Sequence, residues 1–136
     1  MRNHIHNLIF FLLLFTSNSI EAGNNSPVIN VMYFHGPIRC HECLMIEQFT
    51  DQTLTSNFSK ELKSGEITWQ ATDFTTDTTN NFEERYKLET QSLVLSKVVN
   101  GKEIKWIKLE KVWDYLKDYS KFEKYVKSEI TNLIKE

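Results

Sequence analysis

The chain has 136 residues, a length that suits one globular domain and leaves little room for a second. It carries 18 acidic residues and 16 lysines and arginines, so its formal net charge is −2. A protein that binds a polyanion needs an excess of positive charge, and this composition therefore argues against nucleic acid as a partner.

Residues 1–22 have the organisation of a secretory signal peptide. A polar start carrying Arg2 precedes the apolar run Leu8–Phe15, and mostly small or polar residues follow as far as Ala22. This run is much shorter than the roughly 20 apolar residues of a spanning helix. We therefore expect cleavage after Ala22, a mature domain over 23–136, and export to a periplasmic or extracellular location. An uncleaved membrane anchor is the alternative.

The first half of the mature chain predicts a β-α-β unit. Pro27–Phe34 is rich in Val, Ile and aromatic residues, which indicates a buried strand. A helix is expected over Cys40–Leu62, with Gly65 as its stop and a bend or break around Thr50–Asp51. Glu66–Phe74 alternates apolar and polar residues and predicts a second strand. The apolar positions of the helix are Leu44, Phe49, Leu54, Phe58 and Leu62.

The middle of the chain predicts a short helix and then a hairpin. A turn-rich connector ends at Asn80-Asn81, and either residue can cap a helix over 82–88. Ser92–Val99 and Lys102–Ile107 are strand-like runs on either side of Asn100-Gly101. That dipeptide between two such runs is typical of a type I′ β-hairpin.

The C-terminal part predicts a final amphipathic helix. Ser120 and Glu123 have the spacing of a capping box at its start. Its apolar face is expected to comprise Phe122, Val126, Ile130 and Leu133. The aromatic residues expected to pack in the core just before it are Trp113, Tyr115 and Tyr119. The order of elements predicts an α/β domain with a central mixed β-sheet flanked by helices on both faces.

The only two cysteines, Cys40 and Cys43, stand where the first strand passes into the first helix. A disulfide between them closes a very small loop and stabilises weakly, so a chemical role is the better explanation. Unpaired N–H groups and the helix dipole favour a thiolate at a helix start. We expect Cys40 to be the attacking thiol and Cys43 to resolve the mixed disulfide. Haem attachment is excluded because Leu44 follows the pair where histidine is required.

Four neighbouring residues are expected to modulate this chemistry. Arg39 and His41 favour a thiolate at the first cysteine, whereas Glu42 opposes it. His41 is equally well explained as an exposed polar residue. Glu47 follows the second cysteine by one turn on the same helix face and is expected either to relay a proton or to be a surface carboxylate.

Metal binding is the main chemical alternative. Cys40, Cys43 and His35 form a dithiol with a nearby imidazole, a set that suits soft ions such as Cu(I). A closed zinc site needs four ligands, and the adjacent pair Cys40 and His41 fits poorly around one tetrahedral ion. A lone loop histidine is more often structural, so the principal expectation is no metal and no cofactor.

A Cys-x-x-C pair at a strand-to-helix junction, in this order of elements, resembles the thioredoxin fold over Val28–Ile134. Within that fold the chain is similar to the nitrophenyl compound nitroreductase subunit ArsF family of small exported thioredoxin-like proteins. The stretches that carry this likeness are YFHGPIRCHECLMIE, YKLETQSLVL and KWIKLEKVWDYLKD. The resemblance implies a redox-active disulfide.

Two positions depart from the thioredoxin pattern. The resemblance implies a loop facing the cysteine pair at Thr90-Gln91, where Gln91 stands in place of the pattern's cis-proline. The pattern also has a buried acid on the first strand, and the corresponding residues Met32-Tyr33 carry no carboxylate. These departures leave the metal-binding alternative open.

The sequence thus predicts an exported thioredoxin-like thiol–disulfide oxidoreductase with protein thiols or disulfides as partners. A membrane redox partner is compatible with this location, and a monomer is expected. The alternatives are a dithiol module that binds a soft metal or metalloid without catalysis, and an accessory subunit of a redox complex.

Overall fold

The computed structural model describes residues 26–136, so the predicted signal peptide lies outside the described part. No helix within that part has the length and apolar character needed to cross a membrane. The elements in chain order are β1 (Val28–His35), α1 (His41–Asn57), α2 (Ser59–Ser64), β2 (Ile67–Asp73), η1 (Phe74–Thr76), α3 (Phe82–Arg85), β3 (Ser92–Val99), β4 (Lys102–Lys108), η2 (Glu110–Val112) and α4 (Tyr119–Lys135).

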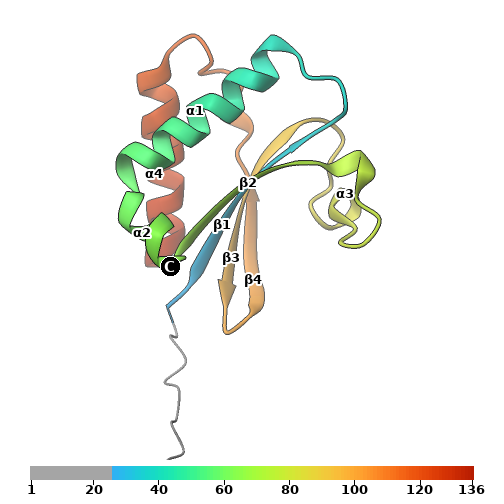
Figure 1. Ribbon diagram of the computed structural model, residues 1–136. Helices are drawn as coiled ribbons and strands as arrows, with labels where there is room; N and C mark the ends of the chain where they lie inside the picture. Colours follow the sequence, from blue (N-terminus) through green and yellow to red (C-terminus); the bar gives the residue numbers. More distant parts are fainter. Residues whose placement is uncertain (1–25) are drawn as a thin grey trace, which may run out of the picture.

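The four strands form one mixed sheet in the order β2-β1-β3-β4 (Figure 1). Strand β1 pairs parallel with β2 and antiparallel with β3, and β3 pairs antiparallel with β4. The central position of β1 explains its nearly continuous apolar sequence, because a strand covered on both faces buries successive side chains. The predicted α/β architecture with a mixed sheet is confirmed.

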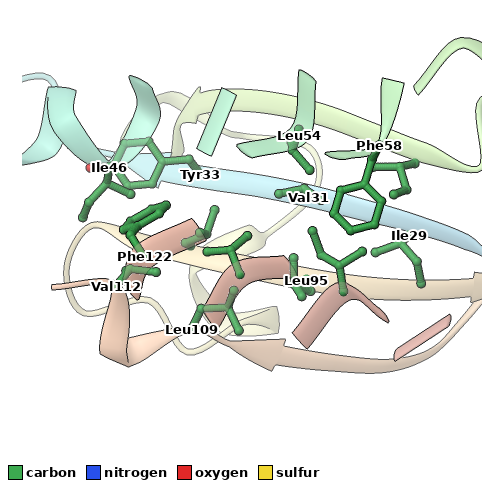
Figure 2. Packing of buried hydrophobic residues seen from close by; sticks show 14 of the residues in the cluster. Ile29, Val31, Tyr33, Ile46, Leu54, Phe58, Leu95, Leu109, Val112 and Phe122 are labelled. Atoms are coloured by element: carbon green, nitrogen blue, oxygen red, sulfur yellow. The ribbon is translucent and has the colours of Figure 1, made fainter. Parts of the chain in front are cut away.

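The larger core lies between the sheet and the helices α1 and α4, which cover the same face of the sheet (Figure 1). Figure 2 shows this packing, with Tyr33 beside Ile46 and with Phe58, Leu54 and Val31 further along. The α4 residues predicted to be apolar and inward-facing are all buried, namely Phe122, Val126, Ile130 and Leu133. Burying such side chains is the main force that holds helices to a sheet.

A smaller core covers the opposite face of the sheet under α3. Met32 and Phe34 of β1 point into it, because successive strand residues face opposite sides. Phe34 packs against Phe82 and Tyr86, with ring centroids 4.9 and 5.5 Å away. Trp106 of β4 meets the Tyr86 ring edge-on at 5.5 Å. Helices therefore flank both faces, as the sequence predicts.

The hairpin also forms as predicted. Asn100 and Gly101 have positive φ angles of 52° and 74°, the left-handed conformations that a type I′ turn requires at both central positions. Glycine adopts such a conformation without steric cost, and asparagine tolerates it better than most residues. The turn sets the pairs Val99–Lys102 and Val98–Glu103, and a register shift between Lys97 and Val98 then changes the pairing along the rest of the hairpin.

Several details of the helices differ from the prediction. Helix α1 continues through Thr50–Asp51, and the break occurs instead at Phe58, whose side chain turns into the core and is 7% exposed. Leu44 is 49% exposed and lies outside the buried face. The N-cap of α4 is Asp118 rather than Ser120, and its carboxylate accepts a hydrogen bond from the Lys121 backbone N–H at 3.2 Å.

Smaller differences concern α3. This helix ends at Arg85, three residues earlier than predicted, and Asn81 is its N-cap residue. The Asn81 side chain does not cap the backbone; its Nδ2 donates to the Glu84 side chain. The first backbone N–H of the helix instead donates to the Asp77 carboxylate at 3.2 Å. A carboxylate satisfies an exposed helix N–H as well as an amide oxygen does.

Asn57 joins α1 to α4 where α1 ends. Its Nδ2 donates one hydrogen bond to the Thr53 carbonyl at 3.0 Å and another to Oε1 of Glu123 at 2.8 Å. Both amide hydrogens are therefore used, one within α1 and one across to α4. This contact fixes the C-terminal end of α1 against α4.

Candidate active site

Cys40 and Cys43 form a disulfide at the start of α1, with Cα atoms 5.0 Å apart. The two sulfurs differ sharply in environment, since Cys40 is exposed and Cys43 is fully buried. A reagent or partner protein can therefore approach Cys40 directly, while Cys43 is shielded beneath it. This asymmetry is what an attacking thiol and a resolving thiol require.

Local geometry explains why Cys40 occupies the helix start. It is the N-cap residue, with an extended backbone at φ −74° and ψ 167°, and its sulfur accepts a hydrogen bond from the Cys43 N–H at 3.1 Å. Its carbonyl accepts from the Leu44 N–H at 3.1 Å and begins the helical hydrogen bonding. A sulfur in this position faces the unpaired N–H groups of the first turn, which stabilise negative charge.

The loop before the disulfide is held by a chain of polar contacts from β1 to α1. The His35 Nδ1–H donates to the Gly36 carbonyl at 2.9 Å, which leaves Nε2 free to accept from the Arg39 guanidinium at 3.3 Å. Arg39 in turn forms an ion pair with Glu47. This assignment of the His35 proton satisfies both contacts at once.

The residues predicted to modulate the thiolate divide into two groups. His41 and Glu42 are exposed, and among the described residues neither side chain makes a hydrogen bond or an ion pair. Arg39 and Glu47 are both partly buried and bind each other. Glu47 is a partly exposed carboxylate whose ion pair with Arg39 holds the loop, and its role as a proton relay stays a prediction.

Tyr33 is a buried polar residue beneath this loop. From the sequence, this position was noted only for carrying no carboxylate. Its side chain is fully buried, and its hydroxyl has no hydrogen-bond partner in the described structure. Burial raises the pKa of Tyr33 to about 12, with Arg39 lowering it and Glu47 raising it by smaller amounts. Tyr33 is thus neutral at physiological pH and feels the charges of both loop residues.

Asp73 is a second residue that the sequence analysis missed. It ends β2 directly opposite His35, because the parallel strands β1 and β2 finish at the same edge of the sheet. A hydrogen bond from the Thr75 hydroxyl at 2.7 Å holds the pKa of Asp73 below its ordinary value, and the charges of His35 and Arg39 lower it further. No local sequence signal identifies it, because the strand register that places Asp73 opposite His35 is fixed only in the folded sheet.

Thr90 and Gln91 lie at the same end of the sheet as the disulfide, since Ser92 of β3 pairs with Phe34 near the end of β1. Their side chains bond to each other through the Thr90 hydroxyl at 2.7 Å, and the Ser92 hydroxyl donates to the Thr90 carbonyl at 2.9 Å. They border a hollow of about 230 Å³ lined by Glu89, Thr90, Gln91, Ser92, Leu93, Lys108, Leu109, Glu110 and Trp113. Within residues 26–136, no hydrogen bond joins either side chain to Cys40 or Cys43.

The candidate metal ligands do not converge. Within residues 26–136, no group of three or more His, Cys, Asp or Glu side chains is arranged to hold a metal ion. His35 directs its Nε2 at Arg39, and the two sulfurs are bonded to each other. The arrangement described here is that of a disulfide site.

Comparisons of the chain with models of protein families, with curated proteins and with solved structures find no match. The likeness of three stretches to the ArsF family therefore stays a prediction.

Proposed function

We propose that the protein is an exported thioredoxin-like thiol–disulfide oxidoreductase. The observation that carries this proposal is the contrast between an exposed Cys40 at the N-cap of α1 and a fully buried Cys43 one turn later. A structural disulfide does not need its sulfurs to be presented in this way. A redox disulfide does, because one sulfur must meet the partner and the other must wait within reach.

The topology supports the thioredoxin-like part of the proposal. The chain builds a parallel β1-α1-β2 unit, crosses to an antiparallel β3-β4 hairpin and ends with α4 packed beside α1. The cysteine pair follows β1 directly, as the resemblance to that fold implies. The export part rests on residues 1–22, and a secreted location is where a stable disulfide is expected.

The proposed reaction is a two-electron exchange. In the reduced protein, the Cys40 thiolate attacks a sulfur of the partner's disulfide, forms a mixed disulfide and releases one partner thiolate. The Cys43 thiol then loses its proton and attacks the Cys40 sulfur, which releases the second partner thiol and leaves the Cys40–Cys43 disulfide. The protein dithiol is oxidised by two electrons, and the partner disulfide is reduced by two.

The test is the reduction potential of the Cys40–Cys43 couple, measured on metal-free protein against a glutathione buffer. We expect a reversible couple between roughly −120 and −270 mV, the range of known exchange proteins. Turnover of a disulfide substrate such as insulin should be lost in Cys40→Ser. A couple below about −300 mV, or no reversible couple, would contradict the proposal. Retention of one metal equivalent that Cys43→Ser abolishes would favour the dithiol-binding alternative.

A further inference from the structure

A shallow groove of about 300 Å³ lies between α1 and β2, one helical turn from Cys40. We call it the α1–β2 groove; it is lined by Leu44, Glu47, Gln48, Asp51 and Trp69. The Leu44 N–H donates to the Cys40 carbonyl, so Leu44 is the groove residue nearest to the exposed cysteine along the helix. The groove then follows α1 away from the disulfide, because residues three to four positions apart share one helix face.

The groove has one exposed apolar side chain, Leu44, at the end near the disulfide and an exposed carboxylate, Asp51, further along α1. Trp69 pairs with Val31, four positions before the end of β2 that lies opposite His35, and so belongs to the part of the groove further from the disulfide. Leu44 is one of the few large apolar side chains exposed in the described structure, at 49%, and Trp69 is only partly buried. Glu47 is neutralised by Arg39. Asp51 is exposed, and its carboxylate makes no hydrogen bond or ion pair within residues 26–136. Leu44 and Trp69 are the apolar side chains that this groove offers to a bound chain.

We propose that the α1–β2 groove binds the segment next to the partner's cysteine and selects partners with an apolar and then a basic side chain. This inference rests on the proposed function, since a mixed disulfide at Cys40 must bring the partner's chain over the start of α1. The apolar side chain contacts Leu44, and the basic one meets the unpaired charge of Asp51.

The helix geometry sets the spacing of this motif. At about 1.5 Å per residue, Leu44 lies roughly 6 Å from Cys40 along the helix axis and Asp51 roughly 16 Å. An extended chain advances about 3.3 Å per residue. The favoured partner therefore carries its apolar residue about two positions, and its basic residue about five positions, from the cysteine.

The test uses the reduced protein and peptides whose single cysteine is linked by a disulfide to 2-nitro-5-thiobenzoate. Attack by Cys40 releases the coloured thiolate, and Cys43 then releases the peptide thiol, so two electrons pass from the dithiol to each peptide disulfide. The matched peptides place Leu two positions and Lys five positions from the cysteine, either before or after it. In the variant peptides, Gly replaces Leu or Glu replaces Lys. The comparator is cysteine amide linked to 2-nitro-5-thiobenzoate by the same disulfide.

In one of the two orientations, we expect the matched peptide to react about 3-fold faster than the Glu variant, as an exposed ion pair allows. It should react about 5-fold faster than the Gly variant, because Leu buries apolar area. The Lys preference should vanish in Asp51→Asn and persist in Glu66→Gln, an exposed carboxylate that precedes β2 and does not line the groove. The Leu preference should vanish in Leu44→Gln and persist in Ile104→Gln, an exposed apolar control on β4.

The two levels of the proposal fail in different ways. If the comparator reacts but the peptides show no preference, the groove inference is wrong and the proposed function stands. A preference that survives in Asp51→Asn and Leu44→Gln would also overturn the inference. If neither the comparator nor any peptide reacts, the proposed function fails and the inference falls with it.

Discussion

Arg39 and Glu47 form an ion pair that ties the loop before Cys40 to the second turn of α1, eight positions further along the chain. The same guanidinium also donates a hydrogen bond to Nε2 of His35, the last residue of β1. Strand, loop and helix are thus connected at the point where the chain presents Cys40. The pair also balances the positive charge next to Cys40.

We expect opposite effects from removing each member of this pair. Glu47→Gln leaves the Arg39 charge unbalanced, which favours the Cys40 thiolate and should raise its alkylation rate at pH 6 by about 3-fold. Arg39→Gln removes the positive charge and should lower that rate. Both variants should lose at most about 1 kcal/mol of stability, because the pair is partly exposed. Equal rates in the wild type and both variants would contradict this role.

Two buried tyrosines should respond differently to loss of the hydroxyl. The Tyr33 hydroxyl has no partner, so Tyr33→Phe should leave the free energy of unfolding at pH 7 unchanged or slightly raised. The Tyr86 hydroxyl donates to Glu103 at 2.7 Å, so Tyr86→Phe should cost about 1–2 kcal/mol. Urea unfolding of the two variants measures the difference, and an equal loss in both would show that the assignment is wrong.

Alkaline pH should destabilise the protein through Tyr33. Burial raises its pKa to about 12, whereas the unfolded chain has a tyrosine pKa near 10. The unfolded state therefore loses this proton first, and the stability present below pH 10 is lost as pH rises toward 12. Tyr33→Phe should remove this contribution, so the variant should gain roughly 1–2 kcal/mol relative to wild type by pH 11.5. If the difference in unfolding free energy between Tyr33→Phe and wild type does not change with pH, the prediction is wrong.

The reduced cysteines should differ in reactivity. Cys40 is exposed and faces the helix start, whereas Cys43 is fully buried. Iodoacetamide should therefore modify Cys40 at least about 10-fold faster than Cys43. Mass spectrometry of proteolytic fragments after short exposure distinguishes the two sites. Similar rates for both would mean that the burial of Cys43 does not persist after reduction.

The start of α4 offers a test of helix capping. Asp118→Ala removes the carboxylate that accepts from the Lys121 N–H and should cost about 1 kcal/mol. Ser120→Ala, the position favoured by the sequence pattern, should change stability by less than about 0.5 kcal/mol. Thermal unfolding of both variants decides between the two caps, and a larger loss in Ser120→Ala would reverse the assignment.

Local sequence predicted the strands and the hairpin well because their signals are local. Asn100-Gly101 needs only its own turn geometry, and the apolar run of β1 needs only burial. The break between α1 and α2 at Phe58 was not predictable in this way. It depends on the packing of the Phe58 side chain in the larger core, which involves residues distant in the sequence. Leu44 shows the same limit, since its helical spacing suits the core but α1 is oriented with that side outward.

The candidate site likewise has a part that the local sequence predicts and a part that it does not. The cysteine pair could be placed from sequence, since a strand followed by a helix puts it at the helix start. The contacts of Arg39 with Glu47 and His35 could not, because Arg39 lies in the loop between β1 and α1, where no helix or strand period fixes the direction of a side chain. The pairing of His35 with Asp73 depends on strand register, which only the folded sheet fixes.

The double hydrogen bond of Asn57 bears on how the protein can be modified. Asn57-Phe58-Ser59 matches the Asn-x-Ser pattern at which secretory enzymes attach a sugar chain to the amide nitrogen. Attachment replaces one of the two hydrogens that bind Thr53 and Glu123. A sugar at Asn57 and the join between α1 and α4 therefore compete for the same nitrogen. In a glycosylating cell, chains would carry the sugar only if they receive it before they fold.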